Sequence, residues 1–224
     1  AWGCEPCTMA DIKSYKPAEK SIGTGQVLPG AYPYEKARLI AREMTDLLAL
    51  DLVDKKMVTD QIVLTLGYDA ESLRDPIIRK AYRGEITTDH YGRPIPRHAH
   101  GTANLEGLTA SSKLLTDAVT ALFERIADPT LLIKRVNVTA NHVADERKAA
   151  QAKAVLQLDL FTDYAAVNAR REREKAMLER EKKTQQAMLA IKRKLGKNAI
   201  IKGMNLEEGA TTLARNAQIG GHKA

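Results

Sequence analysis

The sequence is poor in aromatic residues and in cysteine. Aromatic side chains make up 4% of its 224 residues, which disfavours a single-strand platform where successive bases stack on exposed rings. Its two cysteines, Cys4 and Cys7, permit no disulfide framework beyond this local pair. The sequence also lacks a signal peptide and a long apolar run, so we expect a cytoplasmic protein without a membrane partner.

The charge balance is moderately basic. The chain has 35 Lys+Arg against 28 Asp+Glu, a formal net charge of +7 and a pI near 9.3. This excess favours a nucleic-acid partner, because phosphate contacts draw on Lys and Arg. The chain opens at Ala1-Trp2-Gly3 without a methionine, and we interpret it as a fragment of a longer protein.

Hydrophobic periodicity predicts a β-α-β-β-α-β order. The expected strands cover residues 21–28, 59–68, 98–105 and 131–143, and the expected helices cover 34–55 and 111–128. A turn signal at 91–94 predicts a hairpin arm or a long loop before the third strand. Two helices cannot cover both faces of a small sheet. We therefore predict an α+β fold, a four-stranded sheet with both helices on one face and the other face open.

The predicted open face is polar. It carries Gln61 and Thr65, then His98, His100, Thr102 and Asn104, and then Arg135, Asn137, Thr139 and Asn141. These side chains form hydrogen bonds and include no acid, which suits contact with a duplex backbone. The same pattern also fits a merely solvated face, and a register error of one residue would invert the two faces.

Several segments together resemble a known family. They are Lys20-Ser21-Ile22-Gly23, His100-Gly101, the helix start at Ser111 and Lys134-Arg135-Val136. In this order they resemble the little-finger domain of bacterial Y-family (translesion) DNA polymerases of the UmuC and DNA polymerase IV type. Residues 5–13, 203–210 and 218–222 are similar to the linker and tail of a bacterial subgroup. The resemblance divides the chain into the end of a thumb and linker (1–18), a little-finger domain (19–146) and a C-terminal tail (147–224).

The resemblance implies a role in translesion synthesis, DNA repair and the SOS response. A little finger lies along template-primer DNA and contacts its phosphates. On this basis and on strand alternation, we predict DNA contacts by Lys20, Thr24, Gln61, Arg97, His98, His100, Thr102, Lys134, Arg135, Asn137 and Thr139. In this family, palm-domain carboxylates bind two Mg²⁺ ions for nucleotidyl transfer. We find no palm segment here, and we assign this chain no catalytic residue, cofactor, metal or small-molecule ligand.

A second short motif follows the predicted domain. Gln157-Leu158-Asp159-Leu160-Phe161 resembles the pentapeptide that binds the bacterial sliding clamp. Such a peptide would bury Leu160 and Phe161 in an apolar pocket, while Gln157 forms hydrogen bonds. The alternative is that the apolar residues dock on the protein's own core.

Other interpretations remain open at this point. A ferredoxin-like module that binds only protein would use the same fold, and His98 and His100, with His90 nearby, could chelate a metal. The Cys4-x-x-Cys7 spacing is typical of half a zinc site or a redox pair, but no second pair accompanies it. Residues 170–183 mix both charges and predict an exposed helix or little tertiary structure. Residues 196–224 are expected to be loosely ordered unless a partner holds them.

Overall fold

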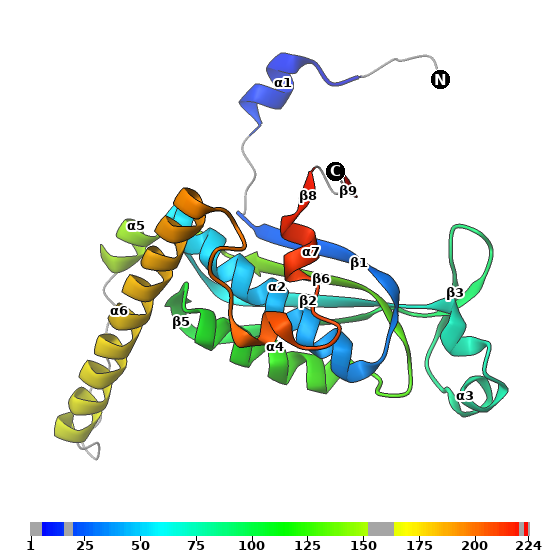
Figure 1. The fold of residues 1–224 in the computed structure, drawn as a ribbon. Coiled ribbons are helices and arrows are strands. Elements are labelled where there is room, and N and C mark those ends of the chain that lie inside the picture. Colours follow the sequence, from blue (N-terminus) through cyan, green and yellow to red (C-terminus); the bar gives the residue numbers. More distant parts are fainter. Residues whose placement is uncertain (1–5, 16–19, 152–163, 220–221, 224) are drawn as a thin grey trace.

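A computed structural model describes residues 6–15, 20–151, 164–219 and 222–223 (Figure 1). The predicted clamp peptide at 157–161 and Cys4 lie outside these residues. The chain begins with the short helix α1 (Met9–Ser14), which has Thr8 as its N-cap. The Thr8 hydroxyl accepts from the Asp11 amide at 3.2 Å, and the Asp11 carboxylate accepts from the Thr8 amide at 2.9 Å. This reciprocal pair is a capping box.

The domain consists of the strands and helices that hydrophobic periodicity predicts. The long strands are β1 (Ile22–Tyr32), β2 (Met57–Tyr68), β5 (Ala99–Thr109) and β6 (Ile133–Asn141), and the helices are α2 (Tyr34–Lys55) and α4 (Ser112–Ile126). The strands lie antiparallel in the order β1-β6-β2-β5, and the short β7 (Ala144–Asp145) pairs with β2. Both helices lie on one face of the sheet (Figure 1). The predicted α+β fold is confirmed.

The hydrophobic core lies between the sheet and the two helices. Buried side chains alternate along the central strands, with Ile62, Leu64 and Leu66 on β2 and Val136, Val138 and Ala140 on β6. Phe123 of α4 is fully buried, and its ring meets the edge of Tyr34 at a centroid distance of 5.0 Å. Because alternate strand residues point to opposite faces, the same alternation leaves polar side chains on the uncovered face.

An arm, residues 69–98, connects β2 to β5. It contains η1 (Ala70–Leu73), α3 (Pro76–Ala81) and the hairpin strands β3 (Ile86–Thr88) and β4 (Pro94–Pro96). The arm extends from the end of the domain opposite α6 (Figure 1). Its base is anchored where the Asp69 amide donates to the Leu132 carbonyl at 2.8 Å and the buried Ser72 hydroxyl accepts from the Leu132 amide at 2.9 Å. The expected hairpin is confirmed.

The chain after the sheet forms α5 (Glu146–Gln151) and the long helix α6 (Tyr164–Leu195). Glu181 of α6 accepts from the Ser111 hydroxyl at 2.5 Å and from the Lys113 amide at 2.9 Å. Its carboxylate therefore lies at the N-terminus of α4, where the helix dipole favours negative charge. The predicted exposed helix at 170–183 is confirmed, and its docked portion begins near Glu181. No helix among the described residues combines the length and apolar character that a membrane span requires.

A strap, residues 196–217, crosses back over α2. It contains η2 (Gly203–Leu206) and α7 (Thr212–Asn216), and a small hairpin of β8 (Gln218–Ile219) and β9 (His222–Lys223) follows it. Lys202 reaches the buried Asp46 of α2 at 2.5 Å and the Ser112 hydroxyl at 3.0 Å. The expectation of a loosely ordered tail is therefore wrong for the strap, because polar groups of the domain itself hold it.

Candidate nucleic-acid interface

Cross-strand pairing assembles a polar surface on the uncovered side of the sheet, which we call the open face. Its rows are Asn104–Gln61–Asn141, Thr102–Val63–Thr139 and His100–Thr65–Asn137, each running across β5, β2 and β6. Residues that pair directly across neighbouring strands share a face. Since Ile62, Leu64 and Leu66 point into the core, these rows point away from it. The predicted side of the sheet is correct for β2, β5 and β6.

Hydrogen bonds between side chains hold parts of the open face in place. Asn141 Nδ2 donates to Gln61 Oε1 at 3.0 Å, and Gln61 Nε2 donates to Asn104 Oδ1 at 2.9 Å. Thr65 Oγ1 lies 2.9 Å from His100 Nδ1. Groups held in this way lose less side-chain entropy when a ligand contacts them. Asp and Glu are absent from these rows in the described chain.

A β-bulge lets two adjacent cations, Lys134 and Arg135, both point away from the core at one end of β6. Ile133 and Val136 are both buried, and they pair with Tyr68 and Leu66 of β2. Arg135 pairs with Gly67, so Lys134 is the extra residue of the bulge. Strict alternation would have pointed Lys134 into the core. The bulge instead lets both Lys134 and Arg135 line a hollow that lies between the end of the sheet and the arm.

Thr24 is a correction to the predicted site. Its hydroxyl accepts from Arg215 of the strap at 3.4 Å, so it lies on the face that the helices and the strap cover. Ile22 and Leu28 lie two and four residues from Thr24 along β1, so all three side chains point to the same face. Leu28 is buried and Ile22 packs against the core. The prediction failed because the open-face positions of β1 include Gly23 and Gly25, which carry no side chain to mark that face. The sequence signal that could have placed Thr24 on the covered face was the apolar Leu28, four residues further along the same strand.

Gly23 and Gly25 leave the open face without side chains at two positions of β1 beside β6. They pair with Thr139 and Asn137. A Cβ at Gly23 would lie 2.7 Å from the Thr139 hydroxyl, and one at Gly25 would clash with the Asn137 side chain. At these two positions β1 therefore presents only backbone on this face, and a ligand can approach the Asn137 and Thr139 side chains closely.

The remaining predicted residues lie around this face. Lys20 is exposed just before β1, and its carbonyl accepts from the Val143 amide at 3.0 Å. Arg97 is exposed and forms an ion pair with Glu85 within the arm. His98 is exposed and lines the same hollow as Lys134. Arg97 is therefore the least available of these groups, since its guanidinium already has an acidic partner.

The arm brings residues to the hollow that sequence reasoning missed. Arg74, Tyr91 and Arg93 line it opposite Lys134 and Arg135. The backbone amide of Arg93 donates to the Asp89 carboxylate and lowers the pKa of that carboxyl group, so Asp89 stays ionised. The turn at 91–94 was the sequence signal for these arm residues, because it combines an aromatic and a basic residue.

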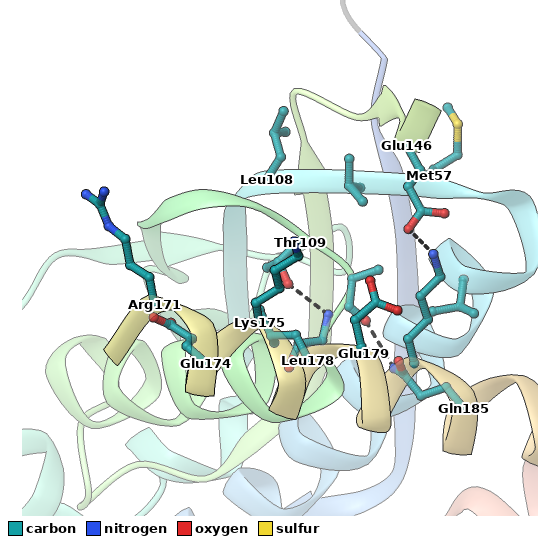
Figure 2. Close-up of a pocket in the computed structure, with 15 residues that line it drawn as sticks. Met57, Leu108, Thr109, Glu146, Arg171, Glu174, Lys175, Leu178, Glu179 and Gln185 are labelled. Atoms are coloured by element: carbon teal, nitrogen blue, oxygen red, sulfur yellow. Dashed lines mark hydrogen bonds and ion pairs between the residues drawn. The ribbon is translucent and has the colours of Figure 1, made fainter. Parts of the chain in front are cut away.

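A second hollow, of about 380 Å³, separates α6 from the end of the sheet (Figure 2). Figure 2 shows Met57 and Leu108 on the domain side and Lys175, Leu178 and Glu179 on α6. Across this hollow, Lys182 forms an ion pair with Glu146 at 2.5 Å. The Gln185 side chain donates to the Ala110 carbonyl at 3.0 Å. Both charges line this groove, which lacks the cationic character expected of a phosphate site.

The metal and cysteine alternatives depend on His90, His98 and His100 and on the Cys4-x-x-Cys7 pair, of which Cys4 lies outside the described residues. Within the described ranges, no group of three or more His, Cys, Asp or Glu side chains could hold a metal ion. His100 is bonded to Thr65, and His98 lies at the hollow instead of beside a third ligand. Cys7 is an exposed free thiol.

Comparison with known proteins identifies the family. A search of curated proteins finds no match. The family model described as the impB/mucB/samB family C-terminal domain matches residues 19–160, well over half of the 224-residue chain. That domain is the C-terminal little finger of Y-family polymerases, and its range includes all four long strands and both helices of the sheet domain. The chain therefore belongs to the little-finger, or C-terminal, domain family of Y-family DNA polymerases.

Proposed function

We propose that the open face grips the phosphate backbone of template-primer DNA and serves a translesion polymerase as a sequence-independent DNA holder. The observation that carries this proposal is the β-bulge at Lys134, which lets Lys134 join Arg135 at the end of a polar face. Phosphate contacts position a protein on DNA without reading sequence, and they need such donors rather than base-edge contacts.

The composition of the open face favours DNA over the protein-only alternative. Cores of protein interfaces are enriched in aromatic side chains, Met and Arg, while Lys, Asp, Glu and Ser are depleted there. In the three rows that define the open face, Val63 is the single apolar side chain, and hydroxyl, amide and imidazole groups make up the rest. Such a surface suits a hydrated phosphate backbone.

The Lys134→Ala/Arg135→Ala variant tests this proposal. It is expected to raise the dissociation constant for primer-template DNA at least about tenfold near 0.1 M salt, because two phosphate contacts are lost. The slope of log affinity against log salt should fall by about two. Fluorescence anisotropy over a salt series measures both quantities.

The matched control is Lys55→Ala/Lys113→Ala. It removes the same charge from the helix layer, where these lysines pair with Asp51 and Asp117 at 2.6 and 2.7 Å. We expect it to bind DNA nearly as well as the wild type. Equal loss of affinity in both variants, or binding that does not respond to salt, would contradict a grip centred on the open face.

We also propose that Gln157–Phe161 tethers the protein to the bacterial sliding clamp. The peptide follows the sheet domain and lies between α5 and α6 in the sequence. A weak peptide contact gains effective strength when the same molecule also holds DNA, since the second contact becomes intramolecular.

The Leu160→Ala/Phe161→Ala variant is expected to lose clamp affinity by more than about tenfold, because these two side chains would be the apolar anchors. Its affinity for DNA should not change. Calorimetric titration with the purified clamp measures the first quantity, and Thr162→Ala/Asp163→Ala is the adjacent control. Undiminished clamp binding by the Leu160→Ala/Phe161→Ala variant would refute the tether.

A further inference from the structure

The arm presents an aromatic side chain on a well-defined turn. Asp89 Oδ1 accepts from the backbone amides of Tyr91 and Arg93, each at 2.9 Å, and Oδ2 accepts from Arg93 Nε at 2.7 Å. Gly92 adopts a φ of 77°, and its amide donates to the Asp89 carbonyl at 3.0 Å. These bonds determine where the Tyr91 backbone lies, so the ring is presented by a turn with little freedom.

Tyr91 does not contribute to the core. It is 80% exposed, although a ring of this size gains much from burial. Its neighbours come from the same turn: the Arg93 guanidinium lies 5.3 Å from the ring centroid, and the His90 ring lies 5.5 Å away in an edge arrangement. A supported but exposed ring is suited to stack on a ligand with a π face.

A hollow of about 770 Å³ lies between this turn and the end of the open face. The basic and imidazole side chains around it are Arg74, His90, Arg93, His98, Lys134 and Arg135. The acids of its lining are already engaged: Asp69 caps η1, Glu71 lies 3.7 Å from Arg74, and Asp89 holds the turn.

Two of these cations remain available for a ligand. Across the described chain, Lys134 and Arg135 take part in none of the ion pairs. The hollow also continues from the open face, since Thr65 and Asn137 line both. A chain of phosphates could therefore pass from one surface to the other without leaving cationic and polar groups.

We infer that the hollow between the arm and the sheet binds an unpaired stretch of DNA that continues from the gripped duplex, with Tyr91 stacked on a base. Lys134 and Arg135 hold the phosphates at the junction. The inference rests on the proposed function, because the duplex on the open face brings the strand to the arm. A single strand is favoured over more duplex because paired bases already stack on each other and offer no free face to a tyrosine ring.

The test uses two DNA molecules with the same duplex, one blunt and one with a short single-stranded extension of the template. The wild-type chain should bind the extended DNA more tightly. The Tyr91→Ala variant should lose about tenfold in affinity for the extended DNA and little for the blunt one, given the usual strength of base–aromatic stacking. Tyr91→Phe keeps the ring and should keep the preference. A 2-aminopurine in the extension should be quenched by the wild type and not by Tyr91→Ala.

Tyr15→Ala is the matched control, since Tyr15 is 74% exposed at the end of α1 and does not line the hollow. It should bind both DNA molecules as the wild type does. If the wild type binds both equally, or if Tyr91→Ala weakens both to the same extent, the arm site is overturned while the backbone grip stands. If neither DNA binds at low salt, the proposed function fails and this inference fails with it.

Discussion

The Glu43→Ala variant is expected to lose about 3 kcal/mol of unfolding free energy, because hydrogen bonds to a buried charged group are strong and their loss leaves buried donors unsatisfied. Glu43 lies on α2 and is 1% exposed. Its carboxylate accepts from Asn205 Nδ2 at 2.7 Å and from the Thr211 amide at 2.8 Å, both in the strap.

Glu43 also interacts with the charge of Arg215. Burial lowers the pKa of Arg215, and the negative charge of Glu43 counteracts this shift. Removing the carboxylate therefore weakens several strap contacts together. Urea unfolding should show a lower midpoint, and amide exchange should accelerate in residues 196–217.

Glu43→Gln is the graded control. Its amide keeps one acceptor oxygen but directs an NH₂ group toward a second donor, so it should lie between the wild type and Glu43→Ala. Because the strap covers the helix side, neither variant should change affinity for DNA through the open face. If amide exchange in the strap is as slow in the Glu43→Ala variant as in the wild type, the role assigned to this carboxylate is contradicted.

The Phe123→Ala variant is expected to lose about 3–5 kcal/mol, since truncating a buried aromatic residue removes its burial energy and leaves a cavity. Phe123 is fully buried in α4, and its ring packs against Tyr34 at the start of α2. The ring therefore joins the two helices above the sheet. Small domains have about 5–15 kcal/mol of stability in total, so this variant should be close to unfolded at elevated temperature.

Two controls separate a cavity from a general effect of altering α4. Phe123→Leu retains most of the apolar volume and should cost about 1–2 kcal/mol. The neighbouring Glu124→Ala removes a partly exposed ion pair with Arg38 at 3.1 Å and should cost less than about 1 kcal/mol. Circular dichroism in urea measures all three. If Phe123→Ala loses no more unfolding free energy than Glu124→Ala, the centre of the core lies elsewhere.

Much of the domain is predictable because its patterns are local. The helix at 34–55 was expected with the bounds it has, and the alternation from Gln61 to Leu66 assigned both faces of β2 correctly. The same period of two placed Thr102 and Asn137 on the open face. Such predictions need only neighbouring residues, because side-chain direction in a strand or helix follows from backbone geometry.

The sequence by itself determined the element order, the two-layer α+β architecture and the polar character of the open face. Tertiary structure alone decided the strand order β1-β6-β2-β5, the bulge at Lys134, the covered position of Thr24 and the docking of the strap. A bulge is a relation between two strands, so it has no signature within one strand. The strap carries few large apolar residues, and its order depends on burying polar groups against Glu43 and Asp46, more than 150 residues earlier in the chain. Local periodicity does not report such distant pairing, which exists only once the chain has folded.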